Sequence, residues 1–327
     1  MLQKLTRRLS FLVVAGILSV PGAHAQGVEK ASIKLAMAAP SPAFLPLYLA
    51  DSEGFFKAEG LSVGMVTFRS GSDAVRGLVS GAIDINAGSL NEVLHAIEAG
   101  QPFRVFYSGM NSSLTDWYAV PQVNSIKDTA GKRYGVTNYG SMIDFLTRYA
   151  LMANKINPKD VKIIPAGKSS ARVAAMEAGQ LDVNALIPPA KYVAADRGFK
   201  KIFSQRDLAP DYPLEVFAAS EKTLDKAPKT VKAFLRAYAK GVEFAKKNRD
   251  KAIAELEKRL GVKGKYASMS YDEVIKDIYA DGRLPSKGGM KVYWDLEAMS
   301  GDAKKPLPES RWLDRRYMDS YAKWSKM

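Results

Sequence analysis

The chain has 327 residues, of which 47% are hydrophobic and 25% charged, so it can form one large or two medium α/β domains. It has no cysteine and two histidines, which excludes a disulfide-stapled fold and leaves no His/Cys cluster for a transition metal. The net charge is +14, but Lys and Arg are scattered without an interleaved aromatic block, so we expect no nucleic-acid partner.

The first 25 residues have the pattern of a secretory signal peptide. A basic start (Lys4, Arg7, Arg8) precedes an apolar core at 11–20 and the small-residue sequence Ala-His-Ala. The core is too short for a permanent membrane anchor. We expect cleavage after Ala25, which removes three positive charges and leaves +11. Without a cysteine to carry a lipid, the mature chain is expected to be free in the periplasm.

The mature chain alternates predicted strands and helices. Residues 33–38 form a weak strand, Pro40-Ser41-Pro42 breaks it, and an apolar helix begins at Phe44. The unit at 69–88 (RSGSDAVRGLVSGAIDINAG) predicts a polar loop, a short helix with Ser72 as N-cap, and a strand. Other strands are expected at 62–68, 103–107, 117–120, 133–137, 161–164, 201–203 and 214–218, and helices at 91–99, 143–152, 190–196 and 251–260.

The C-terminal part is predicted to be helical. A helix beginning at Pro228 keeps a 3.6-residue apolar period, and residues 270–273 have the pattern of a capping box before a further helix. Tyr317, Tyr321 and Trp324 indicate a final amphipathic helix whose aromatic stripe packs on the rest of the chain.

The unit at 69–88 recurs 98 residues later in the chain. Adding 98 places Leu181-Asp182-Val183-Asn184-Ala185 on Ile83-Asp84-Ile85-Asn86-Ala87, and strand 133–138 on 35–40. Chance similarity between two α/β segments is the alternative reading. We expect two similar lobes, formed by residues 28–118 plus 219–327 and by residues 119–218.

The sequence has few residues and motifs that are typical of catalytic sites. After cleavage His95 is the sole imidazole, and no serine lies in a G-x-S-x-G context. Neither a calcium loop, a phosphate-binding G-x-x-x-x-G-K-[ST] nor a G-x-G-x-x-G motif is present. We expect no catalytic residues, no metal site and no cofactor. The enzymatic alternative is an exported enzyme that uses carboxylates alone, such as Asp73 or Glu92.

Small polar loops lie at the starts of several predicted helices. Unpaired N–H groups and the helix dipole make such starts anion sites, and small side chains let a ligand approach the backbone. One loop alone is an ordinary capped helix, but several in two lobes favour a cleft at the carboxyl ends of the strands. The loops are 41–44, 70–72, 89–91, 139–142 and 168–170.

Four segments resemble the sulfonate/nitrate/taurine-type (and thiamine-pyrimidine-precursor-type) solute-binding proteins of ABC importers. They are PSPAFLPLYLADSEGFFKAEGL, SGSDAVRGLVSGAIDI, GKRYGVTNYGSMIDFLTRYAL and DKAPKTVKAFLRAYAKGVEFAKKN. The resemblance covers roughly residues 33–250 and is specific for the family but weak for the ligand. It implies an α/β, two-lobed periplasmic-binding-protein fold (type II-like), with two crossover strands as hinge and the ligand between the lobes.

The resemblance also implies a function. The protein would capture a small, anionic organic solute such as a sulfonate or carboxylate by lobe closure, and deliver it as a monomer to an inner-membrane ABC permease with its ATPase. A ligand-presenting sensory protein is one alternative. An enzyme related to thiamine pyrimidine synthesis is another, but that enzyme uses cysteine- and histidine-rich chemistry. The expected ligand-binding residues are Ser41, Phe44, Ser70, Gly71, Ser72, Ser89, Asn91, Tyr139, Gly140, Ser141, Met142 and Lys168.

Overall fold

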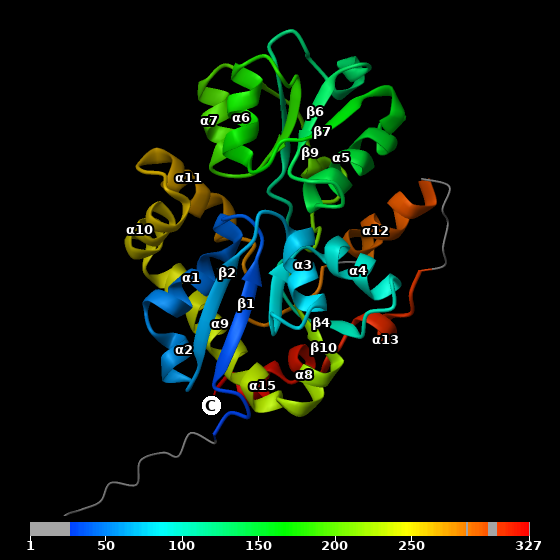
Figure 1. Ribbon diagram of the computed structural model, residues 1–327. Coiled ribbons are helices and arrows are strands. Elements are labelled where there is room, and N and C mark those ends of the chain that lie inside the picture. The colour runs from blue at the N-terminus through cyan, green and yellow to red at the C-terminus, as the bar shows by residue number, and fades with distance from the viewer. Residues whose placement is uncertain (1–26, 286, 300–305, 327) are drawn as a thin grey trace, which may run out of the picture.

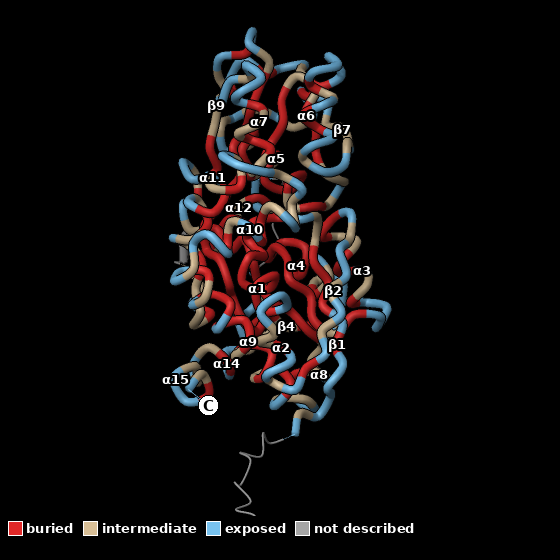
Figure 2. Tube along the Cα trace, turned by 90° about the vertical axis from the view of Figure 1, so that its left-hand side faces the viewer, coloured by how far each residue is buried: buried red, intermediate tan, exposed pale blue. Residues whose placement is uncertain are grey.

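The computed structural model describes residues 27–285, 287–299 and 306–326, so the predicted signal peptide lies outside the described residues. Two lobes are stacked on one another, each with one five-stranded mixed sheet and helices around it (Figure 1). Buried residues fill the centre of both lobes, and exposed residues lie on the outer loops (Figure 2). No helix within the described ranges is long and apolar enough to cross a membrane.

The two sheets have the same strand plan. In order across the sheet, the first contains β2 (Ser62–Thr67), β1 (Ser32–Met37), β3 (Ile85–Gly88), β10 (Glu215–Ser220) and β4 (Phe103–Met110). The second contains β7 (Lys162–Pro165), β6 (Arg133–Val136), β8 (Val183–Leu186), β5 (Asp116–Ala119) and β9 (Lys200–Ser204). In each sheet the first three strands are parallel and the last two pair antiparallel.

The fourth strand of each sheet follows a crossing of the chain between the lobes. β5 leaves the first lobe and pairs with β8 and β9, and β10 returns to pair with β3 and β4. The predicted lobe boundaries at 118/119 and 218/219 therefore fall inside strands, and strand pairing places both crossings earlier. Both segments have the buried apolar composition of inner strands, so they belong to the sheets that they enter.

Helices connect and cover the strands. In the first lobe they are α1 (Leu45–Ser52), α2 (Phe55–Ala58), α3 (Gly71–Val79) and α4 (Leu90–Glu98). In the second they are α5 (Met142–Ala153), α6 (Ser169–Glu177) and α7 (Ala190–Asp196). The C-terminal part contains α8 (Glu221–Lys226), α9 (Pro228–Lys247), α10 (Arg249–Leu260), α11 (Lys265–Val274), α12 (Lys287–Met299), α13 (Glu309–Trp312), α14 (Arg316–Asp319) and α15 (Tyr321–Trp324).

The structure confirms the 98-residue repeat. Helix α6 lies 98 positions after α3 at both ends, and β8 lies 98 positions after β3. The repeated aspartate has the same role in both copies. Asp84 accepts the backbone N–H of Lys34 at 2.9 Å, and Asp182 accepts that of Arg133 at 2.8 Å. Each carboxylate thus joins the start of one inner strand to its parallel neighbour.

Three local predictions were wrong. Ser70, not Ser72, caps α3, because its Oγ accepts the N–H of Asp73 at 3.2 Å. Ser270 lies inside α11, which begins earlier, after the positive-φ residue Gly264. The final amphipathic helix is two short helices, α14 and α15, although Tyr317 and Trp324 are buried as a packing stripe requires.

A buried lysine ties the C-terminal helices to the second lobe. Lys191 of α7 is 5% exposed, and its Nζ lies 2.7 Å from Asp116 of β5 and 2.6 Å from Glu273 of α11. Tyr192 donates a hydrogen bond to the same glutamate, and Arg206 lies 3.1 Å from Asp277. Helix α11 is therefore held to the second lobe through Glu273, by an ion pair and a hydrogen bond.

We expect Lys191→Met to lower the free energy of unfolding by about 3–5 kcal/mol, because it leaves Asp116 and Glu273 without their shared cation. Urea denaturation of the purified variant measures this loss. Lys247→Met is the control, since Lys247 forms an exposed pair with Glu243 that contributes no more than about 0.5 kcal/mol. Equal losses in the two variants would contradict the assignment.

Candidate ligand-binding site

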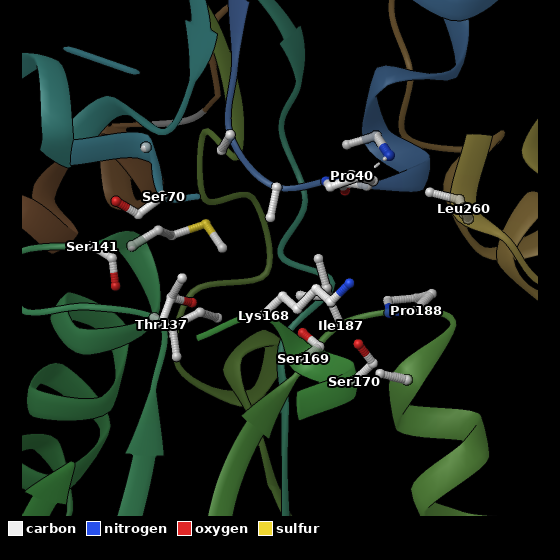
Figure 3. Close-up of a pocket in the computed structure, with 18 of the residues that line it drawn as sticks. Pro40, Ser70, Thr137, Ser141, Lys168, Ser169, Ser170, Ile187, Pro188 and Leu260 are labelled. Atoms are coloured by element: carbon white, nitrogen blue, oxygen red, sulfur yellow. Dashed lines mark hydrogen bonds between the residues drawn. The ribbon is translucent and has the colours of Figure 1, made fainter. Parts of the chain in front are cut away.

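A cavity of about 300 Å³ lies between the lobes at the carboxyl ends of the inner strands. Ala38 follows β1, Gly88 ends β3, Thr137 follows β6 and Ile187 follows β8, and all four line it. In Figure 3, Pro40 and Ser70 of the first lobe lie across the cavity from Ser169 and Ser170 of the second. The topology thus gathers residues from both lobes at one site, as open α/β sheets do.

Most of the sequence-predicted ligand residues line this cavity. The cavity-lining members of the set are Ser41, Phe44, Ser70, Gly71, Ser89, Ser141, Met142 and Lys168. Several of the serines are already used as helix caps. Ser41 accepts the N–H of Ala43 at 3.2 Å, and Ser141 accepts that of Asp144 at 3.4 Å. Their hydroxyls fix the loops that shape the wall.

Four predicted residues do not line the cavity. Ser72 lies behind Ser70, with their Oγ atoms 3.0 Å apart, and Asn91 is buried beneath the wall, where its Oδ1 accepts from Tyr212 at 3.1 Å. Tyr139 is 57% exposed, and its hydroxyl donates to the carbonyl of Ile163 on the outside of the second lobe. Gly140 has φ +72°, a left-handed backbone conformation, and lies in the turn before α5.

Glu92 occupies the position where helix starts from the two lobes meet. One carboxylate oxygen accepts the N–H of Ser89 at 3.3 Å, and the other accepts the N–H of Met142 in the second lobe at 3.0 Å. A Cβ built on Gly71 would lie 1.9 Å from this carboxylate, so any side chain at this position would displace the carboxylate from its present place. Burial raises the pKa of Glu92 to about 7, against the backbone hydrogen bonds, which lower it.

Arg172 is a buried cation that the sequence analysis missed. It is 1% exposed, and one Nη donates to Ser169 Oγ at 2.9 Å, while Nε has no partner. No carboxylate among the described residues pairs with it, and burial lowers its pKa to about 9. The repeat contained a signal for it: Arg172 occupies the position that Ala74 holds on the buried side of α3.

The cavity also has lining residues that no sequence pattern indicated. Glu215 of β10 is 1% exposed, neither of its carboxylate oxygens has a hydrogen-bond partner, and burial holds its pKa well above the ordinary value. Ser169 and Ser170 belong to the predicted loop 168–170, and the remaining unpredicted lining residues include Pro188, Pro189, Val193, Arg197, Leu214, Leu260 and Val262. The two carboxyl groups therefore come from the first lobe, and the cations come from the second.

Two sequence comparisons relate the chain to known proteins. The profile of a family described as NMT1/THI5 like matches residues 41–252. The protein YtlA of Bacillus subtilis, whose name describes it provisionally as a binding protein, is 26% identical over 324 residues, 94% of this chain and 96% of its own. A 4-amino-5-hydroxymethyl-2-methylpyrimidine phosphate synthase of Schizosaccharomyces pombe is 25% identical over 215 residues, 60% of each chain. This chain therefore spans less than two thirds of the synthase.

The fold is also found among solved structures. The alkanesulfonate-binding protein SsuA from Xanthomonas axonopodis pv. citri, bound to MOPS, superposes with a TM-score of 0.72 at 17% identity, over 88% of this chain and all of that one. At this identity the likeness concerns the fold alone. It confirms the predicted two-lobed periplasmic-binding-protein fold.

The raised pKa of Glu92 predicts a pH-dependent stability. A carboxyl group whose folded pKa is about 7 rather than 4.5 contributes stability that is present below pH 4.5 and lost as pH rises through 7. Glu92→Gln does not titrate. The free energy of unfolding of Glu92→Gln minus that of the unaltered protein should therefore increase by about 3 kcal/mol between pH 4.5 and pH 8, because only the unaltered protein loses stability over this range. Denaturant titrations at both pH values measure this difference, and a pH-independent difference would contradict it.

Proposed function

The chain belongs to the NMT1/THI5-like family, and from that premise we propose that it is the solute-binding protein of an ABC importer, with a small anionic organic solute as its ligand. The solute would bind in the interlobe cavity and be delivered to an inner-membrane permease and its ATPase. Export to the periplasm, expected from the first 25 residues, agrees with this role.

The observation that carries the proposal is the unneutralised guanidinium of Arg172. A buried charge without a counter-ion is costly, so a structure that retains one at a cavity wall favours a ligand of opposite charge. Lys168 and Arg197 add positive charge to the same wall, and Ser169 offers a hydroxyl beside Arg172. A sulfonate or carboxylate, with several acceptor oxygens, matches these donors.

Closure of the lobes would couple binding to delivery. Contacts to both walls at once exist only when the lobes are together, so a ligand that spans them shifts the population toward the closed form. A permease that recognises the closed form then receives loaded protein selectively. The strand exchange supports this motion, because the lobes are joined by the two crossings before β5 and β10.

A binding role is favoured over a synthase role by the surroundings of the sole mature histidine. His95 lies outside the cavity lining, and its ring is 5.3 Å from that of Tyr293 on α12. The chain also lacks cysteine altogether. Neither residue type is therefore available for the chemistry on which the synthases depend.

We expect Arg172→Met to abolish solute binding without loss of stability in the ligand-free protein, because it removes a buried cation that has no carboxylate partner among the described residues and whose Nε makes no hydrogen bond. The assay is thermal unfolding against alkyl sulfonates, taurine, nitrate, bicarbonate, aromatic carboxylates and pyrimidine precursors. A ligand at a hundredfold its Kd should add about 2.7 kcal/mol to the unaltered protein, a shift of a few degrees.

The matched control is Arg249→Met, whose side chain pairs with Asp272 on the surface. It should keep the full ligand-induced shift. A shift of unchanged size in Arg172→Met, with circular dichroism showing the native fold, would exclude Arg172 as the anion-binding group.

A further inference from the structure

Lysines that are scattered along the sequence come together at the outer end of the second lobe, the upper end in Figure 1. The parallel strands β6, β7 and β8 finish at the cavity, so the turns that precede them lie at the opposite end of the sheet. The N–H of Gly131 donates to the carbonyl of Asp160 at 2.7 Å, which joins two of these turns, and Lys200 pairs with Ala119 at the same end. Six lysines lie on these turns, and we call them the lysine tip: Lys127, Lys132, Lys155, Lys159, Lys162 and Lys200.

The positive charge of the lysine tip is exposed and is not neutralised by its neighbours. Five of the six lysines are exposed, Lys132 is partly exposed, and none forms an ion pair within the described part of the chain. Asp182 lies at the same end of the sheet, but Arg133 already pairs with it at 2.7 Å. Six lysines beside two further carboxylates, Asp128 and Asp160, leave an excess of four positive charges.

Lys155 occupies its place in the lysine tip against the preference of the backbone. It has φ +62° and is the only residue other than glycine with a positive φ in the described ranges. Its N–H closes α5 by donating to the carbonyl of Met152 at 2.9 Å. The residues that close α3, α4, α6 and α7 in the same way are all glycine: Gly81, Gly100, Gly179 and Gly198. Because glycine adopts this conformation without steric cost, the turn itself does not account for a lysine, whereas a charged surface does.

The composition of the lysine tip fits a diffuse anionic surface better than a protein partner. Protein interfaces are centred on apolar and aromatic side chains. Among the described residues, the large apolar side chains that are exposed all lie elsewhere, on Val66, Val79, Tyr139, Met269 and Met299. Lysine carries a compact, hydrated charge on a flexible stem, so it can attract phosphate groups that have no fixed arrangement.

We propose that the lysine tip binds the anionic phospholipid headgroups of a membrane surface. Lysines are attracted to such a surface when they come within about a Debye length of it, which is roughly 8 Å at physiological salt. The cavity lies at the other end of the strands, so contact through the tip leaves it accessible. This contact holds the protein reversibly beside the membrane in which the proposed permease lies. The inference does not depend on which solute the cavity binds.

The test is co-sedimentation of the purified mature protein with lipid vesicles. One set of vesicles contains phosphatidylcholine alone, and the other contains phosphatidylcholine and phosphatidylglycerol in a two-to-one mixture. We expect binding to the anionic vesicles only. Binding should weaken steeply as the salt concentration is raised, because salt screens the attraction between exposed charges.

Two triple variants that lose the same charge show whether the tip is responsible. In the tip variant the changes are Lys159→Gln, Lys162→Gln and Lys200→Gln, and in the control, on α2 and α8 of the first lobe, they are Lys57→Gln, Lys222→Gln and Lys226→Gln. One lysine near an anionic surface contributes about fivefold to binding, so the tip variant should bind about a hundredfold more weakly. The control should bind within about twofold of the unaltered protein, because its lysines lie at the other end of the molecule (Figure 1).

Lys155→Gly separates membrane binding from folding. It removes one charge from the tip and supplies the residue that closes the other helices. Vesicle binding should therefore fall about fivefold, while the midpoint of thermal unfolding should not fall. A variant that unfolds more readily and keeps its full vesicle binding would show that Lys155 is structural and contradict its assignment to the tip.

Equal binding to the two kinds of vesicle, or equal weakening in the tip and control variants, would overturn the inference. Tip-dependent binding to soluble polyglutamate without binding to anionic vesicles would also overturn it, and would assign the tip to an acidic protein. Arg172→Met should bind the anionic vesicles normally, since Arg172 is buried at the cavity. The inference and the proposed function can therefore fail independently.

Discussion

The hydrogen bonds that Asp84 and Asp182 form to neighbouring strands fix the geometry on which the site depends. Each carboxylate locks the start of one inner strand to its parallel neighbour, so the register of β1 with β3 and of β6 with β8 is set at that end. The opposite, carboxyl ends of these strands then finish level with one another. The loops that follow these strands therefore come together in the space between the lobes, where they line the cavity.

That space is organised by ionisable groups that form no ion pair within the described part of the chain. Burial favours the neutral forms of Glu92 and Glu215 and disfavours the charged form of Arg172, yet all three are retained at one cavity. Functional sites are where such unfavourable burial concentrates. The hydrogen bond from the Met142 N–H to the Glu92 carboxylate also links the two walls of the cavity. This carboxylate therefore joins the lobes as well as contributing an ionisable group to the cavity.

The sequence predicted the fold well because its signals are local. The strand–loop–helix units, the repeat and the small residues at helix starts depend on residues close together in the chain, and they placed most lining loops correctly. Among the charged residues of the cavity, only Lys168 was among the predicted ligand-binding residues. Glu92 reads as an ordinary capping-box acid, and its contact with Met142 spans 50 residues and two lobes, which no local pattern contains. Tyr139 does not line the cavity, since its hydroxyl donates to the carbonyl of Ile163, 24 residues later, which is another contact that no local pattern contains.

The exchange of strands between the lobes also determines the order in which they can be completed. β10 separates β3 from β4, so the first sheet cannot close until Ser220 is available, whereas the second has all its strands by Ser204. The lobe that comes later in the sequence is the first that can finish folding. Before then β4 has no neighbouring strand and β3 has an open edge, and such edges invite pairing with other chains. Insertion of β10 is therefore the step that ends this exposure, and it brings Glu215 into the cavity at the same moment.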